Sequence, residues 1–104
     1  MVTHAITRAV GTSLGDCALT FVDRAPIDLA KAEAQHAAYS ESLRRAGAVV
    51  EVVAADALPD SVFVEDMAVV LDEVAVVTRP GTPLRRRELP AITAALSAYR
   101  KLLR

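Results

Sequence analysis

The spacing of apolar residues along the first half of the chain predicts a strand, a helix and a second strand. Residues 2 to 10 are β-prone and bounded by Gly11, which indicates a strand. Residues 29 to 46 carry apolar or small side chains at spacings of three and four, between an N-cap residue, Asp28, and a C-terminal Gly47. Residues 48 to 55 form a nearly continuous apolar run, typical of a strand buried on both faces. This order favours a parallel pair of strands with a helical crossover.

The second half of the chain predicts two more strands and a second helix. "VFVEDMAVVL", residues 62 to 71, and "VAVVTRP", residues 74 to 80, are separated by Asp72 and Glu73, which suggests an antiparallel hairpin. Residues 89 to 103 have a helical apolar stripe, and we expect the chain to end within that helix. The predicted order is β-α-β-β-β-α, an α/β fold in a single domain over residues 1–104. The unsupported last helix suggests part of a larger fold.

Composition narrows the classes of function. The 104 residues suffice for one small core, and twelve basic against thirteen acidic residues give a net charge of −1. Such a balance argues against a nucleic-acid partner or binding to an acidic membrane surface. No apolar stretch approaches the roughly 20 residues that span a bilayer, and the N-terminus does not resemble a signal peptide. A single cysteine, Cys17, excludes an intramolecular disulfide and fits a cytoplasmic location.

The stretch "LPDSVFVEDMAVV", residues 58 to 70, places three carboxylates beside apolar residues that look like core. Burying an unpaired carboxylate costs several kcal/mol. In a regular strand Asp60 and Asp66 would share one face, with Glu65 on the other unless the chain bends. The acids could hold a guanidinium or ammonium group. A hard metal ion is the rival ligand, although the loop geometry of a calcium site is missing, and solvated loop residues are the third interpretation.

Other candidate residues are fewer. The run from Arg85 to Arg87 precedes the second predicted helix, where one arginine could bind a carboxylate through two N–H groups and the others would be solvated. Cys17 has no neighbouring base in the sequence that would activate it as a nucleophile. His36 lies on the apolar stripe of the first helix, so we expect a packed and hydrogen-bonded core histidine. There is no Gly-rich phosphate loop, G-x-S-x-G or CxxC motif.

Four segments occur in an order and spacing that resemble a known family: "THAITRAVGTSLGDCAL", "DLAKAEAQHAAYSESLRRAG", "LPDSVFVEDMAVV" and "TRPGTPLRRRE". Together they resemble the N-terminal part of the dimethylarginine dimethylaminohydrolases, which belong to the guanidine-modifying (pentein) superfamily. The resemblance implies a partial α/β-propeller built of ββαβ modules. It also implies hydrolysis of Nω-methylated arginines to citrulline and methylamine or dimethylamine, with a cysteine nucleophile, a histidine for proton transfer, and no required metal or organic cofactor.

The resemblance assigns substrate-binding roles to the three acids. Asp60 matches an acid that helps bind the substrate amino group. Glu65 and Asp66 match adjacent acids of the site, and Asp66 is the one expected near the guanidinium.

Three further residues receive roles from the same resemblance. Leu19, in the loop after the first strand, matches a contact to the amino-acid end of the substrate. Phe63 is expected to line the cavity, and Arg85 matches the arginine that grips the substrate carboxylate. The expected ligand is therefore a methylated arginine or an arginine-like small molecule.

The catalytic histidine and cysteine of the family fall in a second part that has no counterpart in this chain, and Cys17 and His36 do not match them. We therefore expect no catalytic residue here and no turnover by the chain alone. A complementing C-terminal chain is one expected partner, and self-association to a homo-oligomer is another. The alternative function is a non-catalytic binding or self-associating fragment, and a weaker one is a relative of the arginine deiminases.

Overall fold

The first half of the chain folds as a strand, a long helix and a parallel strand. The computed structural model describes residues 2–19 and 21–104. Strand β1 (His4–Arg8) pairs in parallel with β2 (Val49–Val53), and α1 (Leu29–Arg45) connects them. The Asp28 carboxylate accepts a hydrogen bond from the Lys31 amide at 3.0 Å, which caps the helix, and the φ of 101° at Gly47 ends it. The predicted parallel pair and both helix signals are confirmed.

The second half forms a three-stranded sheet with one crossover helix. Strand β3 (Ala68–Val70) pairs antiparallel with β4 (Val74–Val77), as the predicted hairpin requires. Helix α3 (Leu89–Leu96) then leads to β5 (Lys101–Leu103), which pairs in parallel with β4. Three short helical elements complete the description: η1 (Leu14–Asp16), η2 (Val64–Asp66) and α2 (Pro83–Arg86). The fold class is α/β, as expected.

The predicted end of the chain is wrong, because the last helix stops at Leu96 and a strand follows it. The predicted order is found as far as α3, and β5 is added to it. The stripe to Leu103 fitted a helical period. However, β4 offers an open edge, and Leu102 packs against the buried core when it pairs there. The pairing of these residues with β4 therefore determines their structure, and the helical spacing of their apolar side chains does not.

The predicted strand over residues 62 to 71 is also wrong in its first part. Residues 64 to 66 form the 3₁₀ turn η2, and only Ala68–Val70 lie in β3. The Met67 amide donates to the Val64 carbonyl at 3.0 Å, a turn bond that no extended strand makes. The prediction that strand alternation puts Asp60 and Asp66 on one face and Glu65 on the other therefore does not apply.

Strand β2 is less buried than predicted. Val49 and Val52 are exposed, and only Val50 and Val53 are half-buried. A strand with a near-continuous apolar run was expected to have both faces covered, but β2 lies at the edge of a two-stranded sheet.

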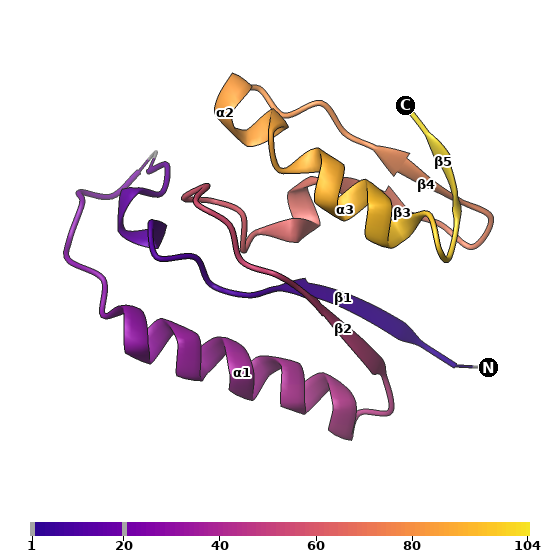
Figure 1. Ribbon diagram of the computed structural model, residues 1–104, viewed down its shortest axis with the longest axis horizontal. Coiled ribbons are helices and arrows are strands. Elements are labelled where there is room, and N and C mark those ends of the chain that lie inside the picture. The colour runs from indigo at the N-terminus through magenta and orange to yellow at the C-terminus, as the bar shows by residue number, and fades with distance from the viewer. Residues whose placement is uncertain (1, 20) are drawn as a thin grey trace.

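Helices and sheets alternate through the molecule (Figure 1). Helix α1 covers one face of the β1–β2 sheet, where the Thr7 and Ser40 hydroxyls lie 3.3 Å apart. Helix α3 contacts both β2 and β4. The core contains Met67, Ala75, Ile92 and Leu96, and the half-buried side chains packed on it come from both sheets. The order of layers is thus α1, the first sheet, α3 and the second sheet.

The outer face of the second sheet carries apolar side chains that no helix covers in the described residues. Val69, Val76 and Leu103 are paired neighbours across β3, β4 and β5, with exposures of 56%, 36% and 44%. We call these three residues the outer apolar row. In the described ranges, no helix has both the length and the apolar character needed to cross a membrane.

Candidate functional site: an arginine held between carboxylates

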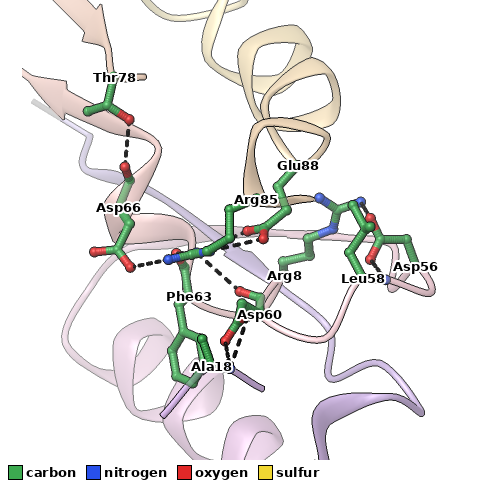
Figure 2. A network of polar contacts seen from close by, with 10 residues as sticks. All are labelled: Arg8, Ala18, Asp56, Leu58, Asp60, Phe63, Asp66, Thr78, Arg85 and Glu88. Atoms are coloured by element: carbon green, nitrogen blue, oxygen red, sulfur yellow. Dashed lines mark hydrogen bonds and ion pairs between the residues drawn. The ribbon is translucent and has the colours of Figure 1, made fainter. Parts of the chain in front are cut away.

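Arg85 is the centre of the polar network in Figure 2. It lies in α2, and its guanidinium forms a fork with Glu88: Nε donates to one carboxylate oxygen and Nη2 to the other, each at 3.0 Å. On the other side Nη1 donates to Asp66 Oδ2 at 2.7 Å. The Arg85 side chain is 18% exposed and that of Glu88 only 1%. The carboxylate that sequence reasoning missed, Glu88, is therefore the most deeply buried member of the site.

The backbone of the 60–63 turn also binds this guanidinium. Arg85 Nη2 donates to the carbonyl oxygens of Asp60 at 3.3 Å and Phe63 at 3.2 Å. The hydrogen bond to Glu88 raises the pKa of Arg85 above its ordinary value, burial acts in the opposite direction, and Asp66 adds a smaller increase. Arg85 is therefore a permanent cation. Its Nη1 group carries two hydrogens, and one acceptor, Asp66, is found for it in the described ranges, so one N–H is available for a ligand.

Asp60 is buried and anchors the loop that follows η1. Both of its carboxylate oxygens accept from the Ala18 amide, at 3.1 and 3.3 Å. A carboxylate has about four lone-pair positions, so this single donor leaves acceptor capacity for an ammonium group.

Asp66 and Glu65 point in different directions, because successive residues of a 3₁₀ helix are rotated by about a third of a turn. The Asp66 side chain is 56% exposed and bonded to Arg85. Its backbone carbonyl accepts from Thr78 Oγ1 at 2.6 Å, which fixes the turn. Glu65 instead lines a cavity of about 570 Å³, together with His36 and Tyr39 of α1. The structure joins Asp60 and Asp66 through Arg85 and separates Glu65 from them.

The two apolar candidates lie at the rim of the network. Leu19 is exposed and directly follows Ala18, whose amide is bonded to Asp60. Arg24 supports this part of the loop, since it donates to the carbonyl oxygens of Gly15 and of Cys17, the latter at 2.7 Å. Phe63 is also exposed, and its carbonyl rather than its ring contacts Arg85.

A second ion pair, between the buried Arg8 and the half-buried Asp56, supports the same region and was not predicted. Arg8 Nη2 donates to Asp56 Oδ2 at 2.8 Å, and Nε donates to the Ala54 carbonyl at 3.0 Å. Asp56 also accepts from the Leu58 amide at 2.9 Å, which orients the loop that leads to Asp60. A Cβ atom on Gly11 would lie 2.5 Å from the Asp56 carbonyl oxygen, so this close approach requires glycine.

The two other sequence candidates have no catalytic setting. Cys17 is buried, and the ring of His36 lies 6.5 Å from that of Tyr39, at the wall of the cavity rather than in the core. No residue in the described ranges is hydrogen-bonded to the His36 side chain, and the ring is half-buried, so the expected hydrogen-bonded core histidine is not found there. Within residues 2–19 and 21–104, no three metal-binding side chains come together.

Two curated proteins to which the chain is similar carry the same name. The chain is 40% identical over 94 residues to N(G),N(G)-dimethylarginine dimethylaminohydrolase of Streptomyces coelicolor, an alignment of 89% of this chain and 36% of that protein. It is 36% identical over 100 residues to the protein of the same name from Pseudomonas aeruginosa, covering 95% of this chain and 39% of that protein. No family model matches the chain.

Solved structures agree with the sequence comparison. A dimethylarginine dimethylaminohydrolase captured as an adduct with S-methyl-L-thiocitrulline superposes with a TM-score of 0.86 at 33% identity, covering 100% of this chain and 42% of that chain. The Pseudomonas aeruginosa enzyme complexed with citrulline superposes with a TM-score of 0.85 at 32% identity, covering 43% of that chain.

The chain is thus an α/β protein with the fold of one part of a dimethylarginine dimethylaminohydrolase. It is a relative of the dimethylarginine dimethylaminohydrolases, as the sequence resemblance indicated, and it spans well under half the length of the relatives it matches.

Proposed function

We propose that this chain holds the substrate-binding part of a dimethylargininase and binds methylated arginines without hydrolysing them. The observation that carries the proposal is the arrangement around Arg85. Asp66 is exposed and binds Arg85 through Oδ2, which leaves its Oδ1 for a substrate guanidinium. The buried carboxylate of Asp60 retains acceptor capacity, and one Arg85 N–H remains for a substrate carboxylate. The solved relatives with citrulline and thiocitrulline groups support an arginine-like ligand.

The same proposal assigns the domain, the other substrate-binding residues and the source of the catalytic residues. The chain is one partial domain of an α/β propeller. Leu19 and Phe63 border the substrate, and Glu65 reaches it from the cavity side. Arg85 contributes one N–H to the substrate carboxylate, because its other donors hold Glu88 and the 60–63 turn. Turnover requires a cysteine and a histidine from a complementing chain, in the cytoplasm.

Asp66→Asn is expected to weaken binding of Nω,Nω-dimethylarginine about 10- to 100-fold, because it removes a charge-assisted hydrogen bond worth about 1.5–3 kcal/mol. Isothermal titration calorimetry on the folded chain measures the change, and circular dichroism verifies the fold. Glu33→Gln is the matched control, since it removes an acid on the exposed surface of α1 and should leave binding unchanged. Equal affinity in the wild type and Asp66→Asn, or citrulline produced by the chain alone, would contradict the proposal.

The second candidate function, a self-associating fragment, is favoured by the outer apolar row. Exposed apolar side chains adjacent across three strands are typical of a surface that contacts another protein. The first sheet has a helix on each face, α1 on one and α3 on the other. The second sheet has α3 on one face only, and its other face, with the outer apolar row, is exposed in the described residues.

Val76→Thr is expected to shift any concentration-dependent oligomer toward monomer, because it places a hydroxyl at the centre of the outer apolar row. Sedimentation equilibrium over a hundredfold range of concentration measures the shift. Val22→Thr, at an exposed apolar position away from this sheet, is the control. A wild-type chain that stays monomeric over the whole range would eliminate this second function.

A further inference from the structure

Arg8 holds residues 54–58, which lead from β2 toward the candidate site and which we call the clamped segment. The Arg8 side chain is 5% exposed. Its Nε donates to the Ala54 carbonyl at 3.0 Å, and its Nη2 donates to Asp56 Oδ2 at 2.8 Å. Because the guanidinium is a rigid plane, this fork fixes the separation of the two acceptors. A lysine has a single charged nitrogen on a flexible stem and cannot reproduce the fork.

The loop that follows β1 holds the clamped segment from a second direction. Ser13 Oγ donates to the Ala57 carbonyl at 2.8 Å. Gly11 lies so close to Asp56 that a Cβ atom would approach the Asp56 carbonyl oxygen to 2.5 Å. The Leu58 amide donates to Asp56 Oδ1 at 2.9 Å, which closes the segment on itself. Side chains and backbone therefore leave the clamped segment little freedom to move.

The clamped segment ends two residues before Asp60 and sets its position. The Ser61 amide donates to the Leu58 carbonyl at 3.3 Å, which joins the segment to the turn that carries Asp60. Asp60 bonds in two directions (Figure 2): its carboxylate accepts from the Ala18 amide, and its carbonyl accepts from Arg85 Nη2. The backbone at Asp60 therefore fixes how an acceptor for an ammonium group is placed relative to the arginine that faces a substrate carboxylate.

Stability alone does not explain a buried arginine at this place. Arg8 Nη1 is buried and has no acceptor among the described residues. A buried donor without an acceptor costs free energy, and an apolar side chain of similar volume would avoid that cost. What only arginine supplies is the geometry of the fork, and this indicates a positioning role.

We propose that Arg8 is a positioning residue that makes the site selective for ligands with a free α-amino group. Asp60 is 6% exposed, so a ligand ammonium must lose its water to reach this carboxylate. A site built to hydrogen-bond a polar group rejects an analogue without that group, because the buried partner is then left unpaired. Such rejection requires a carboxylate that cannot turn to solvent, and the Arg8 fork holds the backbone of Asp60 against that movement.

The part of Asp60 in this selectivity rests on the proposed function, in which its carboxylate receives the ammonium group of dimethylarginine. The fork and the clamped segment rest on hydrogen bonds within the chain alone. Ligand binding therefore tests the selectivity, and a measurement without ligand tests the positioning of Asp60.

Two ligands that differ in one group test the selectivity: dimethylarginine and its deamino analogue, in which hydrogen replaces the α-amino group. Calorimetric titration of the wild-type chain is expected to show about 10- to 100-fold weaker binding of the analogue. Arg8→Lys keeps a cation beside Asp56 and removes the fork, and it is expected to lower this ratio about fivefold or more. A smaller decrease, or a wild type that binds both ligands equally, would overturn the proposal.

The ratio of the two affinities separates positioning from a general loss of structure. A partly unfolded variant binds both ligands more weakly by the same factor, so its ratio stays that of the wild type. Arg45→Lys is the matched control, because the Arg45 side chain lies on α1 and is 79% exposed, and its ratio should not change. In an Asp60→Asn background the carboxylate is already lost, so Arg8→Lys should lower the ratio no further. A further decrease there would contradict an action through Asp60.

The Ala18 amide reports the position of the Asp60 carboxylate without any ligand. Residue-resolved hydrogen exchange is expected to be about tenfold faster at this amide in Arg8→Lys than in Arg45→Lys. The Thr78 amide, which is bonded at the end of the second sheet, should exchange equally in both variants. Unchanged exchange at Ala18, or equal acceleration at Ala18 and Thr78, would overturn the proposal. If the wild type binds neither ligand, the proposed function fails, and exchange at Ala18 alone decides whether Arg8 positions Asp60.

Discussion

Replacing Glu88 by alanine is expected to destabilise the chain by about 3–5 kcal/mol, the cost of breaking a buried ion pair by removing one partner. The Glu88 carboxylate is almost wholly buried and receives both N–H groups of the Arg85 fork. Without it, Arg85 keeps Asp66 and two carbonyl oxygens but loses its only buried counter-charge in the described structure. Urea unfolding followed by circular dichroism measures the loss.

The control for Glu88 is its neighbour Arg87, which is exposed and whose side chain bonds to no residue that the structure describes. Arg87→Ala should change the unfolding free energy by less than about 0.5 kcal/mol. A loss below about 1 kcal/mol in Glu88→Ala would show that the fork adds little to stability. Asp66 would then be the partner that positions Arg85.

Met67→Ala is the second large effect, expected to cost about 2–5 kcal/mol. Met67 is 1% exposed and belongs to the core formed with Ala75, Ile92 and Leu96, against which Ile6 and Val53 of the other sheet also pack. Truncation removes contacts to both sheets and leaves a cavity that the surrounding backbone can close only in part. Thermal and urea unfolding measure the change.

Val69→Ala is the matched control, because Val69 lies two residues away in β3 and faces solvent. Its loss should cost less than about 1 kcal/mol, apart from a small change in β-propensity. Similar losses for the two variants would mean that the core is not centred on Met67.

The sequence predicted well wherever local chemistry and the final packing agree. The cap at Asp28 and the left-handed glycine at Gly47 bound α1, as their residue types required. The hairpin between residues 62 and 80 was found because Asp72 and Glu73 interrupt two β-prone runs.

Prediction failed where a distant partner decides the local structure. Residues 62 to 67 have the composition of a strand, but Arg85 binds the carbonyl of Asp60, just before this segment, and that of Phe63 within it, so the chain turns here instead of joining a ladder. Leu103 belongs to the predicted helical stripe and nevertheless lies in β5, which pairs with an edge of β4 that cannot be read from neighbouring residues. Both errors arise from contacts across twenty or more positions in the chain.

The residues of the candidate site also divide into those that the sequence predicted and one that it did not. Asp60, Asp66 and Arg85 were selected from the sequence, and the structure brings them together. Glu88 was not assigned a role, because an acid after three arginines looks like part of a solvated turn. Its burial becomes visible only when α2 and α3 fold over the 60–63 turn.

Helix α3 belongs to two structural units at once, and this has a consequence for how the chain unfolds. Ile92 and Leu96 contribute to a core that also receives Ile6 and Val53 from the first sheet and Ala75 from the second. Removing α3 from either sheet would expose apolar surface on both, so neither half can melt while the other stays intact. The chain should therefore behave as one cooperative unit, and it cannot be divided between residues 53 and 68 into two independently stable pieces.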